Sequence, residues 1–393
     1  MTKKCIDWLE MNSKKSPNLV LDLNEVKSNY NKFIRFFNGI KPFYAVKANP
    51  NKKIISLLNK LGCNFDCASI KEVQDCIRLD IDPKKISYGN TIKKAEDIKR
   101  AFSLGITLFA FDCEAELCKI SNHAPRSKVF CRIQVPNGGA EWPLSRKFGC
   151  NPIFSEKLLI KAIRLNLNPV GLSFHVGSQQ LSTKTWDKAI KITSIIYKKM
   201  KKKKIFLNFI NLGGGIPADY LFRKKNINEY SNDIKASLKK YFGKNTPAEI
   251  ILEPGRFLVA SAGVLEAEVI LVTDKNYGKD KWVYLDVGRY NGLAETEGEA
   301  IKYKIKVKGY KKYKTYQYIL AGPSCDGHDI LYEKYLYELP QKLKIGDRVR
   351  IFSSGAYTTA YQSNFNGIKK IKEIFLEKIY LYFFIKFGVI KDA

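Results

Sequence analysis

Short apolar segments alternate with amphipathic segments between about residues 40 and 260 of the chain. The first segment of each pair has the β-branched and aromatic character of a buried strand, and the second has the spacing of a helix with one apolar face. Three such pairs are "PFYAVKA" with "KKIISLLNKLG", "FDCAS" with "IKEVQDCIRL", and "TLFAFDC" with "EAELCKISNHA". About eight strands in some 220 residues favour a closed (β/α)8 barrel over an open sheet.

Beyond about residue 261, strand-like segments follow one another without helices between them, as in "GVLEAEVILVTDKN" and "KWVYLDVG". This pattern predicts a second, mostly β domain over 261–370. The early strand 17–23 could return to pair with this domain. The barrel then covers 24–260. Residues 371–393 form a divergent, aromatic and basic tail. We expect a docked helix there, because the apolar run is too short to span a membrane.

Composition restricts the class of protein. The chain has 393 residues, of which 45% are hydrophobic, and this is enough for a sizeable core. No apolar stretch reaches the roughly 18 residues of a membrane span, and the N-terminus lacks the apolar core of a secretory signal, so we expect a cytoplasmic protein. The nine cysteines never form a CxxC pair and therefore indicate reduced thiols rather than disulfides or a metal site.

The charge is strongly positive, with 68 Lys and Arg residues against 38 Asp and Glu residues and a net charge of +30. Such an excess can indicate a nucleic acid partner. The lysines are nevertheless spread over the whole chain, and only 197–206, "YKKMKKKKIF", is a dense cluster. A solvated basic surface is the better interpretation, and we expect neither a nucleic acid nor a membrane partner.

Lys47 follows an apolar strand in "PFYAVKANP", where a lysine is unusual. An ammonium group that is buried loses hydration, and its pKa falls. Such a lysine either extends outward to solvent or is chemically reactive.

Three further motifs lie at the ends of predicted strands, and in a barrel these ends meet at one rim. They are "FHVGSQ" (174–179), "NLGGGIP" (211–217) and "LEPGR" (252–256). Consecutive glycines let backbone N–H groups surround an anion, and a serine hydroxyl and an arginine would add a donor and a charge. A tight turn is the alternative for the glycines, but the nearby polar residues favour a phosphate site formed by Ser178, Gly213, Gly214, Gly215 and Arg256.

A reactive lysine, a phosphate site and an isolated carboxylate are the parts that pyridoxal 5'-phosphate requires. Lys47 would hold the aldehyde, and Glu253 would pair with the pyridine nitrogen. His175 is either a core histidine or stacks on the cofactor ring.

Seven motifs together resemble the fold type III, alanine racemase-like, pyridoxal phosphate-dependent ornithine, lysine and diaminopimelate decarboxylases. The resemblance covers about residues 15–370 and is closest to bacterial ornithine decarboxylases. In family order, the motifs are "PFYAVKAN", "FDCAS", "FHVGSQ", "GGGIP", "EPGRF", "GPSCDGHD" and "GAYTTAYQSNFNG".

The resemblance implies roles for residues of the barrel. Lys47 and Glu253 resemble the catalytic lysine and the ring-nitrogen partner, and His175 resembles the ring-stacking residue. The phosphate contacts implied are Ser178, Gly215, Gly255, Arg256 and Tyr357. The supporting polar residues implied are Asp66, Glu72 and Arg132, and Lys147 resembles a lysine that forms a salt bridge across a dimer.

The resemblance also implies that residues of the second domain act in the partner subunit's site, so that a homodimer shares its two active sites. Cys325 resembles the residue that steers protonation of the product carbon, and Asp326 resembles the contact to the distal amine of the substrate. "CDG" differs from the "CESGD" pattern of diaminopimelate decarboxylases and is typical of enzymes that form plain diamines.

Tyr290 and Phe365 are further substrate contacts that the resemblance implies. Glu299 stands where the family places an acidic specificity residue, with Glu295 as an alternative in a nearby register. The expected reaction is decarboxylation of L-ornithine to putrescine. The alternatives are another specificity, such as lysine, both amino acids, arginine or a carboxylated polyamine, and an inactive regulatory homologue that resembles antizyme inhibitors.

Overall fold

The computed structural model describes seven ranges of the chain. They are residues 3–12, 15–136, 138–142, 147–222, 226–276, 281–310 and 314–377. These residues divide into two compact units, one formed by 29–258 and the other by the described parts of 1–28 and 259–393. The units meet in the sequence at 28/29 and 258/259. The sequence analysis places the barrel domain at 24–260.

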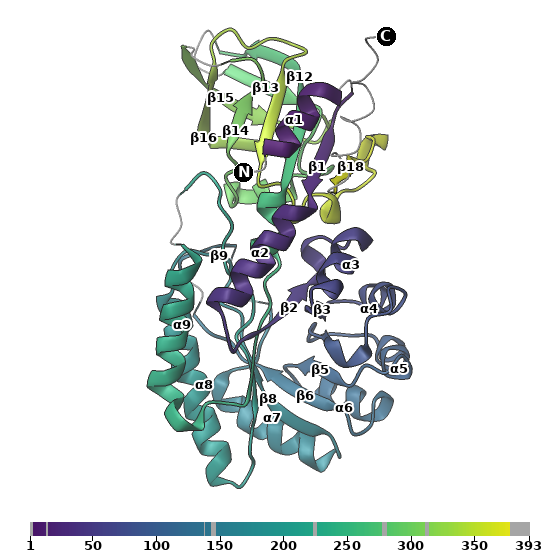
Figure 1. The fold of residues 1–393 in the computed structure, drawn as a ribbon, viewed down its shortest axis with the longest axis vertical. Coiled ribbons are helices and arrows are strands. Elements are labelled where there is room, and N and C mark those ends of the chain that lie inside the picture. The colour runs from purple at the N-terminus through teal and green to yellow at the C-terminus, as the bar shows by residue number, and fades with distance from the viewer. Residues whose placement is uncertain are drawn as a thin grey trace, which may run out of the picture. The chain divides into compact units, whose positions relative to one another are not determined.

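The unit formed by 29–258 contains a closed barrel of parallel strands, which confirms the predicted architecture (Figure 1). The strand order around the barrel is β10, β11, β2, β3, β4, β5, β6, β8. The strands are β2 (Lys41–Ala45), β3 (Asn64–Cys67), β4 (Ile86–Tyr88), β5 (Leu108–Phe111), β6 (Lys128–Arg132), β8 (Asn168–Ser173), β10 (Phe209–Asn211) and β11 (Glu249–Leu252).

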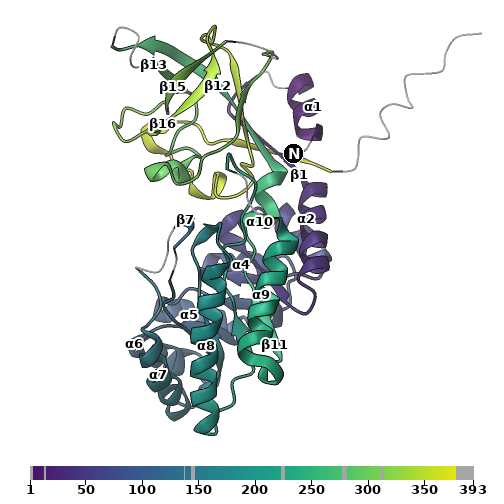
Figure 2. The same cartoon turned by 90° about the vertical axis from the view of Figure 1, so that its left-hand side faces the viewer.

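Helices connect successive strands and cover the outside of the barrel, and α8 runs beside α9 in Figure 2. The helices are α2 (Leu23–Phe36), α3 (Lys52–Lys60), α4 (Ile70–Ile77), α5 (Ala95–Ser103), α6 (Glu114–His123), α7 (Pro152–Arg164), α8 (Lys184–Lys202), α9 (Ile227–Phe242) and the short α10 (Arg256–Val259). Several begin where a side chain accepts a hydrogen bond from the first turn, as Ser69 does for α4 and Asn226 for α9. A ribbon of β7 (Ala140–Trp142) and β9 (Ser178–Gln180) lies outside the barrel sheet.

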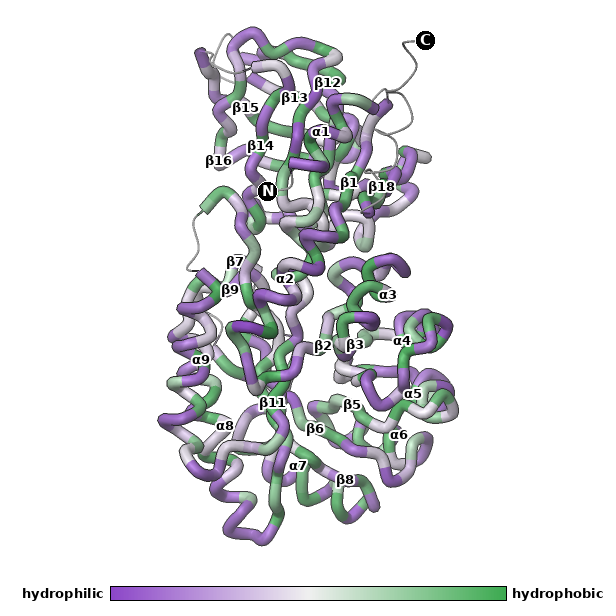
Figure 3. Tube along the Cα trace, viewed as in Figure 1, coloured by the Kyte–Doolittle hydropathy of each residue, from purple (hydrophilic) through white to green (hydrophobic). Residues whose placement is uncertain are grey.

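A cluster of buried apolar side chains from five strands packs in the core of the barrel unit. This core cluster consists of Phe43, Ala110, Phe130, Phe209 and Ile251. Burial of each large side chain contributes about 1.5 to 3 kcal/mol to folding. The surrounding helices change colour from turn to turn in Figure 3, as expected for helices that bury one face and expose the other.

The other unit is a mostly β structure built on an eight-stranded sheet. Its strands are β1 (Asn18–Asp22), β12 (Gly263–Asp274), β13 (Lys281–Leu285), β14 (Ile305–Val307), β15 (Thr315–Ala321), β16 (Ile330–Pro340), β17 (Arg348–Phe352) and β18 (Lys372–Leu376). The order is β14, β17, β12, β13, β15, β16, and β1 pairs with both β12 and β18.

Three elements of this unit differ from the sequence analysis or are missing from it. Residues 372–376 of the tail form a strand parallel to β1, so the expected helix is wrong for them, and residues 378–393 lie outside the described residues. The helix α1 (Lys3–Asn12) was not predicted, nor was the long strand β16. α1 packs Cys5 and Leu9 on the sheet in a cluster that includes Leu376 of β18.

Candidate active site

A cavity of about 230 Å³ opens at the carboxyl ends of the barrel strands. Five of the predicted site residues line it, namely Lys47, Asp66, Arg132, His175 and Glu253. They come from five different segments of the chain, and the parallel barrel brings these strand ends to one rim. Sequence reasoning assigned no role to the other lining residues, which include Asn90 and Phe148, and the Phe148 ring lies 5.0 Å from the Arg132 guanidinium.

Lys47 lies in a short 3-10 helix, Val46–Ala48, directly after β2. Its neighbours Val46 and Ala48 are buried, whereas the Lys47 side chain is exposed at the cavity. The Tyr44 hydroxyl donates to the backbone oxygen of Asn49 at 2.9 Å and holds the turn. Lys47 therefore lines the cavity rather than pointing to the outer surface, and the carboxyl groups of Asp66 and Glu253 line the same cavity.

Two carboxyl groups, the buried Asp66 and the half-buried Glu72, lie near Lys47. Burial raises the pKa of Asp66 well above its usual value, the nearby Glu253 raises it further, and Lys47 acts in the opposite direction. The Ser87 hydroxyl donates to Asp66 at 2.8 Å. Burial also raises the pKa of Glu72, whose carboxylate accepts from the backbone N–H of Ala68 at 2.7 Å. Both groups therefore lie in a weakly solvated environment beside Lys47.

His175 is held as a neutral imidazole. Burial lowers its pKa well below the usual value, and the positive charges of Arg132 and Lys47 lower it further. Its Nδ1 accepts from the backbone N–H of Gly177 at 2.9 Å, so the ring hydrogen lies on Nε2. A neutral ring with this fixed tautomer can stack on a flat ligand without adding charge to it.

The glycine turn that follows β10 leaves no room for side chains. A Cβ on Gly213 would lie 2.2 Å from the backbone oxygen of Phe174, and its φ of +67° is a conformation that glycine adopts freely. A Cβ on Gly214 would lie 2.9 Å from Nε2 of His175, and one on Gly215 would lie 2.6 Å from the oxygen of Gly177. The backbone of this turn therefore borders the histidine of the cavity directly.

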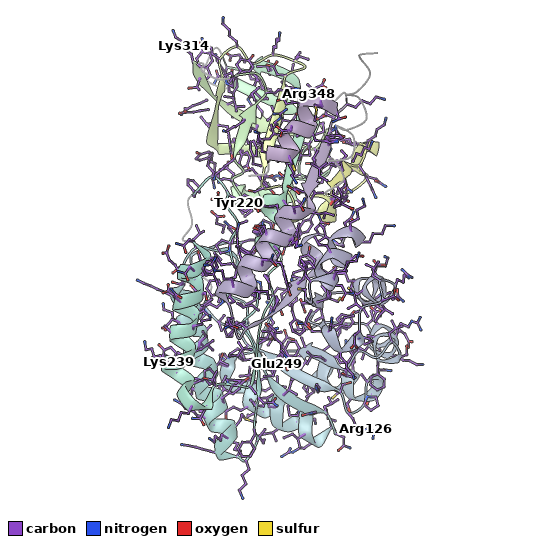
Figure 4. All side chains as sticks on the ribbon, in the orientation of Figure 1. Arg126, Tyr220, Lys239, Glu249, Lys314 and Arg348 are labelled. Atoms are coloured by element: carbon purple, nitrogen blue, oxygen red, sulfur yellow. The ribbon has the colours of Figure 1, made fainter. Side chains whose placement is uncertain are left out.

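Ser178 and Arg256 meet beside this turn. The Arg256 guanidinium donates to the Ser178 hydroxyl at 2.9 Å. Arg256 is only 3% exposed, so its guanidinium is buried near the glycine turn. It also donates to the Tyr220 hydroxyl at 2.9 Å. Tyr220, which is labelled in Figure 4, follows the glycine turn by five residues in the sequence. Sequence reasoning did not assign it a role.

Glu253 is tied to the same turn. The side-chain amide of Asn211 donates to Oε1 of Glu253 at 2.5 Å, and its oxygen accepts from the N–H of Gly213 at 2.8 Å. Gly255, two residues later, packs so closely that a Cβ would lie 2.9 Å from the Cβ of Ala48. The segment carrying Glu253 is therefore in contact with the segment carrying Lys47.

These residues fit pyridoxal 5'-phosphate. The Gly213 to Gly215 turn leaves no room for side chains, and with Ser178 and Arg256 it suits a phosphate that approaches the backbone of Gly214 and Gly215. A primary amine at Lys47 suits the aldehyde, and the Glu253 carboxylate suits a protonated ring nitrogen. Among the residues that the structure describes, no group of His, Cys, Asp and Glu side chains could hold a metal ion.

Four predicted substrate residues gather in the β unit. The ring of Tyr290 lies 4.8 Å from that of Phe365, and its hydroxyl bonds to Asp326. A backbone N–H from His328 and the Tyr290 hydroxyl hold the pKa of Asp326 below its usual value. Cys325 is exposed beside them.

The loop that carries Cys325 is organised by Asp329, which sequence reasoning missed. The Asp329 side chain is 3% exposed and accepts from the N–H groups of Arg289 at 2.7 Å and Ser324 at 3.0 Å. A Cβ on Gly322 would lie 2.4 Å from its carboxylate. Gly322, the first glycine of "GPSCDG", is therefore required because the carboxylate of Asp329 leaves no room for a side chain.

The carboxylate of Glu299, the predicted specificity residue, is bound by the backbone of β16. Its carboxylate accepts three backbone N–H bonds from Glu333, Lys334 and Tyr335 at 2.6 to 3.0 Å. These bonds fasten the 3-10 helix Ala294–Glu299 to β16, while the alternative Glu295 is buried.

Two other implied residues have their own local contacts. The Nζ of Lys147 lies 5.1 Å from the centre of the Phe148 ring. Tyr357 belongs to the β unit, where its ring lies 6.0 Å from that of Tyr361.

Residues 23–260 match the family model described as pyridoxal-dependent decarboxylase, pyridoxal binding domain. The lysine/ornithine decarboxylase of Selenomonas ruminantium is 32% identical over 366 residues, which are 92% of this chain and 90% of that protein. The ornithine decarboxylase of Rattus norvegicus is 32% identical over 365 residues, which are 89% and 78% of the two chains.

A solved structure, the arginine decarboxylase of Paramecium bursaria Chlorella virus, superposes with a TM-score of 0.87 at 27% identity. The match covers 96% of this chain and 100% of that one. In the described part of the chain, no helix is both long and apolar enough to cross a membrane.

Proposed function

Because the chain belongs to the pyridoxal-dependent decarboxylase family, we propose that it converts L-ornithine to putrescine and carbon dioxide. Its cofactor is pyridoxal 5'-phosphate. One observation carries the catalytic part of the proposal: Lys47, Glu253 and a neutral His175 line one cavity. The choice of ornithine is supported by the "GPSCDGHD" motif and by the lysine/ornithine and ornithine decarboxylases among the relatives.

The barrel residues bind and orient the cofactor. The glycine turn, Ser178 and Arg256 would hold the phosphate of the cofactor, and the primary amine of Lys47 would hold its aldehyde. Glu253 would hold a proton on the ring nitrogen, and the neutral His175 would cover the ring. The bound cofactor supplies a ring that accepts the electron pair left behind when carbon dioxide departs.

The reaction breaks one carbon–carbon bond and forms one carbon–hydrogen bond. Carbon dioxide leaves without the bonding electrons. The substrate carbon that carried the carboxylate then takes up a proton, and Cys325 directs this protonation. The Asp326 carboxylate pairs with the distal ammonium of the substrate, a charge that needs a partner once it leaves water. Cys325 is exposed on the β unit and Asp326 is half-buried beside it, and this supports a homodimer in which each subunit completes the other's site.

The test is diamine release from purified protein with pyridoxal phosphate, offered ornithine, lysine, arginine and meso-diaminopimelate separately. We expect putrescine as the dominant product and none from Lys47→Ala. Cadaverine or agmatine as the dominant product would contradict the ornithine assignment alone. Absence of any product from a protein with bound cofactor would contradict decarboxylation and favour the inactive regulatory alternative.

A mixed specificity is the second candidate, because one relative is a lysine/ornithine decarboxylase. One methylene in a pocket is worth only about 1 to 3 kcal/mol, so lysine could be a slower substrate of the same site. Competition assays that measure kcat/KM for both amino acids decide between the two. A ratio near one would replace ornithine specificity by dual specificity.

Shared sites are tested by mixing two inactive variants, Lys47→Ala and Cys325→Ala. Random re-association of dimers should restore roughly a quarter of the wild-type activity, because half of the dimers would contain one intact site out of two. A mixture without activity would contradict shared sites and leave the decarboxylase assignment untouched.

A further inference from the structure

Asn211 uses both ends of its side-chain amide inside the barrel. It is the last residue of β10 and is 1% exposed. Its nitrogen donates to Oε1 of Glu253 at 2.5 Å, and its oxygen accepts from the N–H of Gly213 at 2.8 Å. The N–H of Glu253 in turn donates to the carbonyl of Gly213 at 2.9 Å. These bonds form a closed ring that joins the ring-nitrogen carboxylate to the glycine turn of the phosphate site.

We infer that Asn211 is a positioning residue that fixes the Glu253 carboxylate for the pyridine nitrogen and couples it to the phosphate turn. The inference rests on the pyridoxal phosphate site and holds whichever amino acid is decarboxylated. It extends the site to a residue that contacts neither end of the cofactor in the assignment above.

The chemistry of an amide explains why asparagine suits this position. Its NH2 group only donates, so the facing oxygen of Glu253 has to accept, and the second carboxylate oxygen stays available for the protonated ring nitrogen. Its carbonyl oxygen simultaneously satisfies the buried N–H of Gly213. An apolar residue would leave that N–H without a partner, and burial of an unpaired N–H is costly.

An aspartate at 211 would have the same shape but the opposite effect on Glu253. It could still accept from Gly213, yet it would face Glu253 with a second carboxylate, and two carboxylates at that distance have to share a proton. The other charged or titratable groups of the cavity are Lys47, Asp66, Arg132 and His175. Because the substitution changes none of them, a new pH dependence in Asn211→Asp would report on the pair formed with Glu253.

The experiment measures cofactor binding and the absorbance of the bound cofactor, and neither reading requires a substrate. Apo forms of wild type, Asn211→Ala and Asn211→Asp are titrated with pyridoxal phosphate, and the absorbance of each complex is recorded from about pH 6 to about pH 9. Asn64→Ala is the matched control. Asn64 is the first residue of β3, at the end of the strand away from the cavity, and its side-chain amide donates one hydrogen bond to the backbone oxygen of Pro42 at 3.3 Å.

For Asn211→Ala we expect roughly 10- to 100-fold weaker cofactor binding, the loss that follows removal of one hydrogen bond to a charged group. For Asn211→Asp we expect weaker binding and an absorbance that changes with pH where that of wild type is constant. Asn64→Ala should match wild type in both readings.

Wild-type affinity together with a wild-type pH profile in Asn211→Asp would overturn the inference, as would an equal loss of affinity in Asn64→Ala. If Asn211→Ala fails to fold, the isosteric Asn211→Asp still decides the question. Failure to decarboxylate ornithine would contradict the proposed function without changing these two readings.

Discussion

Replacement of Lys93 by methionine tests how a buried charge stabilises the segment behind the cavity. The Lys93 side chain is fully buried, and its Nζ lies 2.9 Å from Oε1 of Glu116. The same nitrogen donates to the backbone oxygens of Asn90 at 2.8 Å and Ala110 at 2.7 Å. Asn90 lines the cavity, so Lys93 connects the ion pair to the site. Methionine keeps much of the length of the side chain and removes the charge and the donors.

The expected cost follows from these contacts. Removing one partner of a buried ion pair costs about 3 to 5 kcal/mol when the other charge is left alone. Lys119 still lies 2.6 Å from Glu116, so Glu116 keeps a partner, and two carbonyl groups lose a donor at about 1 kcal/mol each. We therefore expect Lys93→Met to lower the free energy of unfolding by about 3 kcal/mol near neutral pH.

The difference should grow as the pH rises. Burial lowers the pKa of Lys93 to about 8 from 10.5, and Glu116 opposes this shift. Between these two values the unfolded chain holds the proton and the folded protein has released it, so the stability of wild type rises with pH. The variant lacks this contribution. The wild-type advantage should therefore increase by up to about 3 kcal/mol over this range.

Urea unfolding of wild type and Lys93→Met near pH 7 and near pH 10 measures both quantities, and Glu116→Gln completes a double-mutant cycle. Other groups that titrate at high pH are present in both proteins and cancel in the comparison. A cost below about 1 kcal/mol at neutral pH, or a difference that shrinks at high pH, would refute the reasoning.

Three further predictions concern the glycine turn and the β unit. Gly213→Ala should abolish pyridoxal phosphate binding in an absorbance titration, because its Cβ would meet Phe174 at 2.2 Å, and normal binding would contradict the assigned turn. Asp329→Ala should lower kcat/KM by about tenfold or more and leave cofactor affinity unchanged, since it releases the N–H of Ser324 beside Cys325; unchanged kinetics would count against it. Glu299→Gln should cost about 1 to 2 kcal/mol in urea unfolding, because an amide offers one acceptor oxygen to three N–H groups, and wild-type stability would exclude this anchoring role.

The barrel and most of its cavity could be predicted because their signals are local. Each strand and helix has its own hydrophobic period, and eight parallel strands confirm the interpretation. Motifs at the carboxyl ends of parallel strands have to meet at one rim, and Lys47, Asp66, Arg132, His175 and Glu253 do line one cavity.

Pairings between distant segments had no such local signal. The strand β18 exists because Lys372–Leu376 pairs with Asn18–Asp22, some 350 residues earlier, and a helix was the better local interpretation. The helix α1 is likewise held by packing on that sheet through Cys5 and Leu9. These elements depend on a partner surface that the local period does not describe.

The sequence by itself determined the residue types of the site, the order of the strands that carry them and the cofactor chemistry they suit. Only the tertiary structure decided which polar atoms meet. Asn211 reaches Glu253 across 42 residues, and Glu299 accepts backbone N–H bonds from β16. Likewise, the neutral state of His175 depends on burial and on the charge of Arg132. Hydrogen-bond partners and pKa values are set by distance and solvation in space, and neither quantity is a function of spacing along the chain.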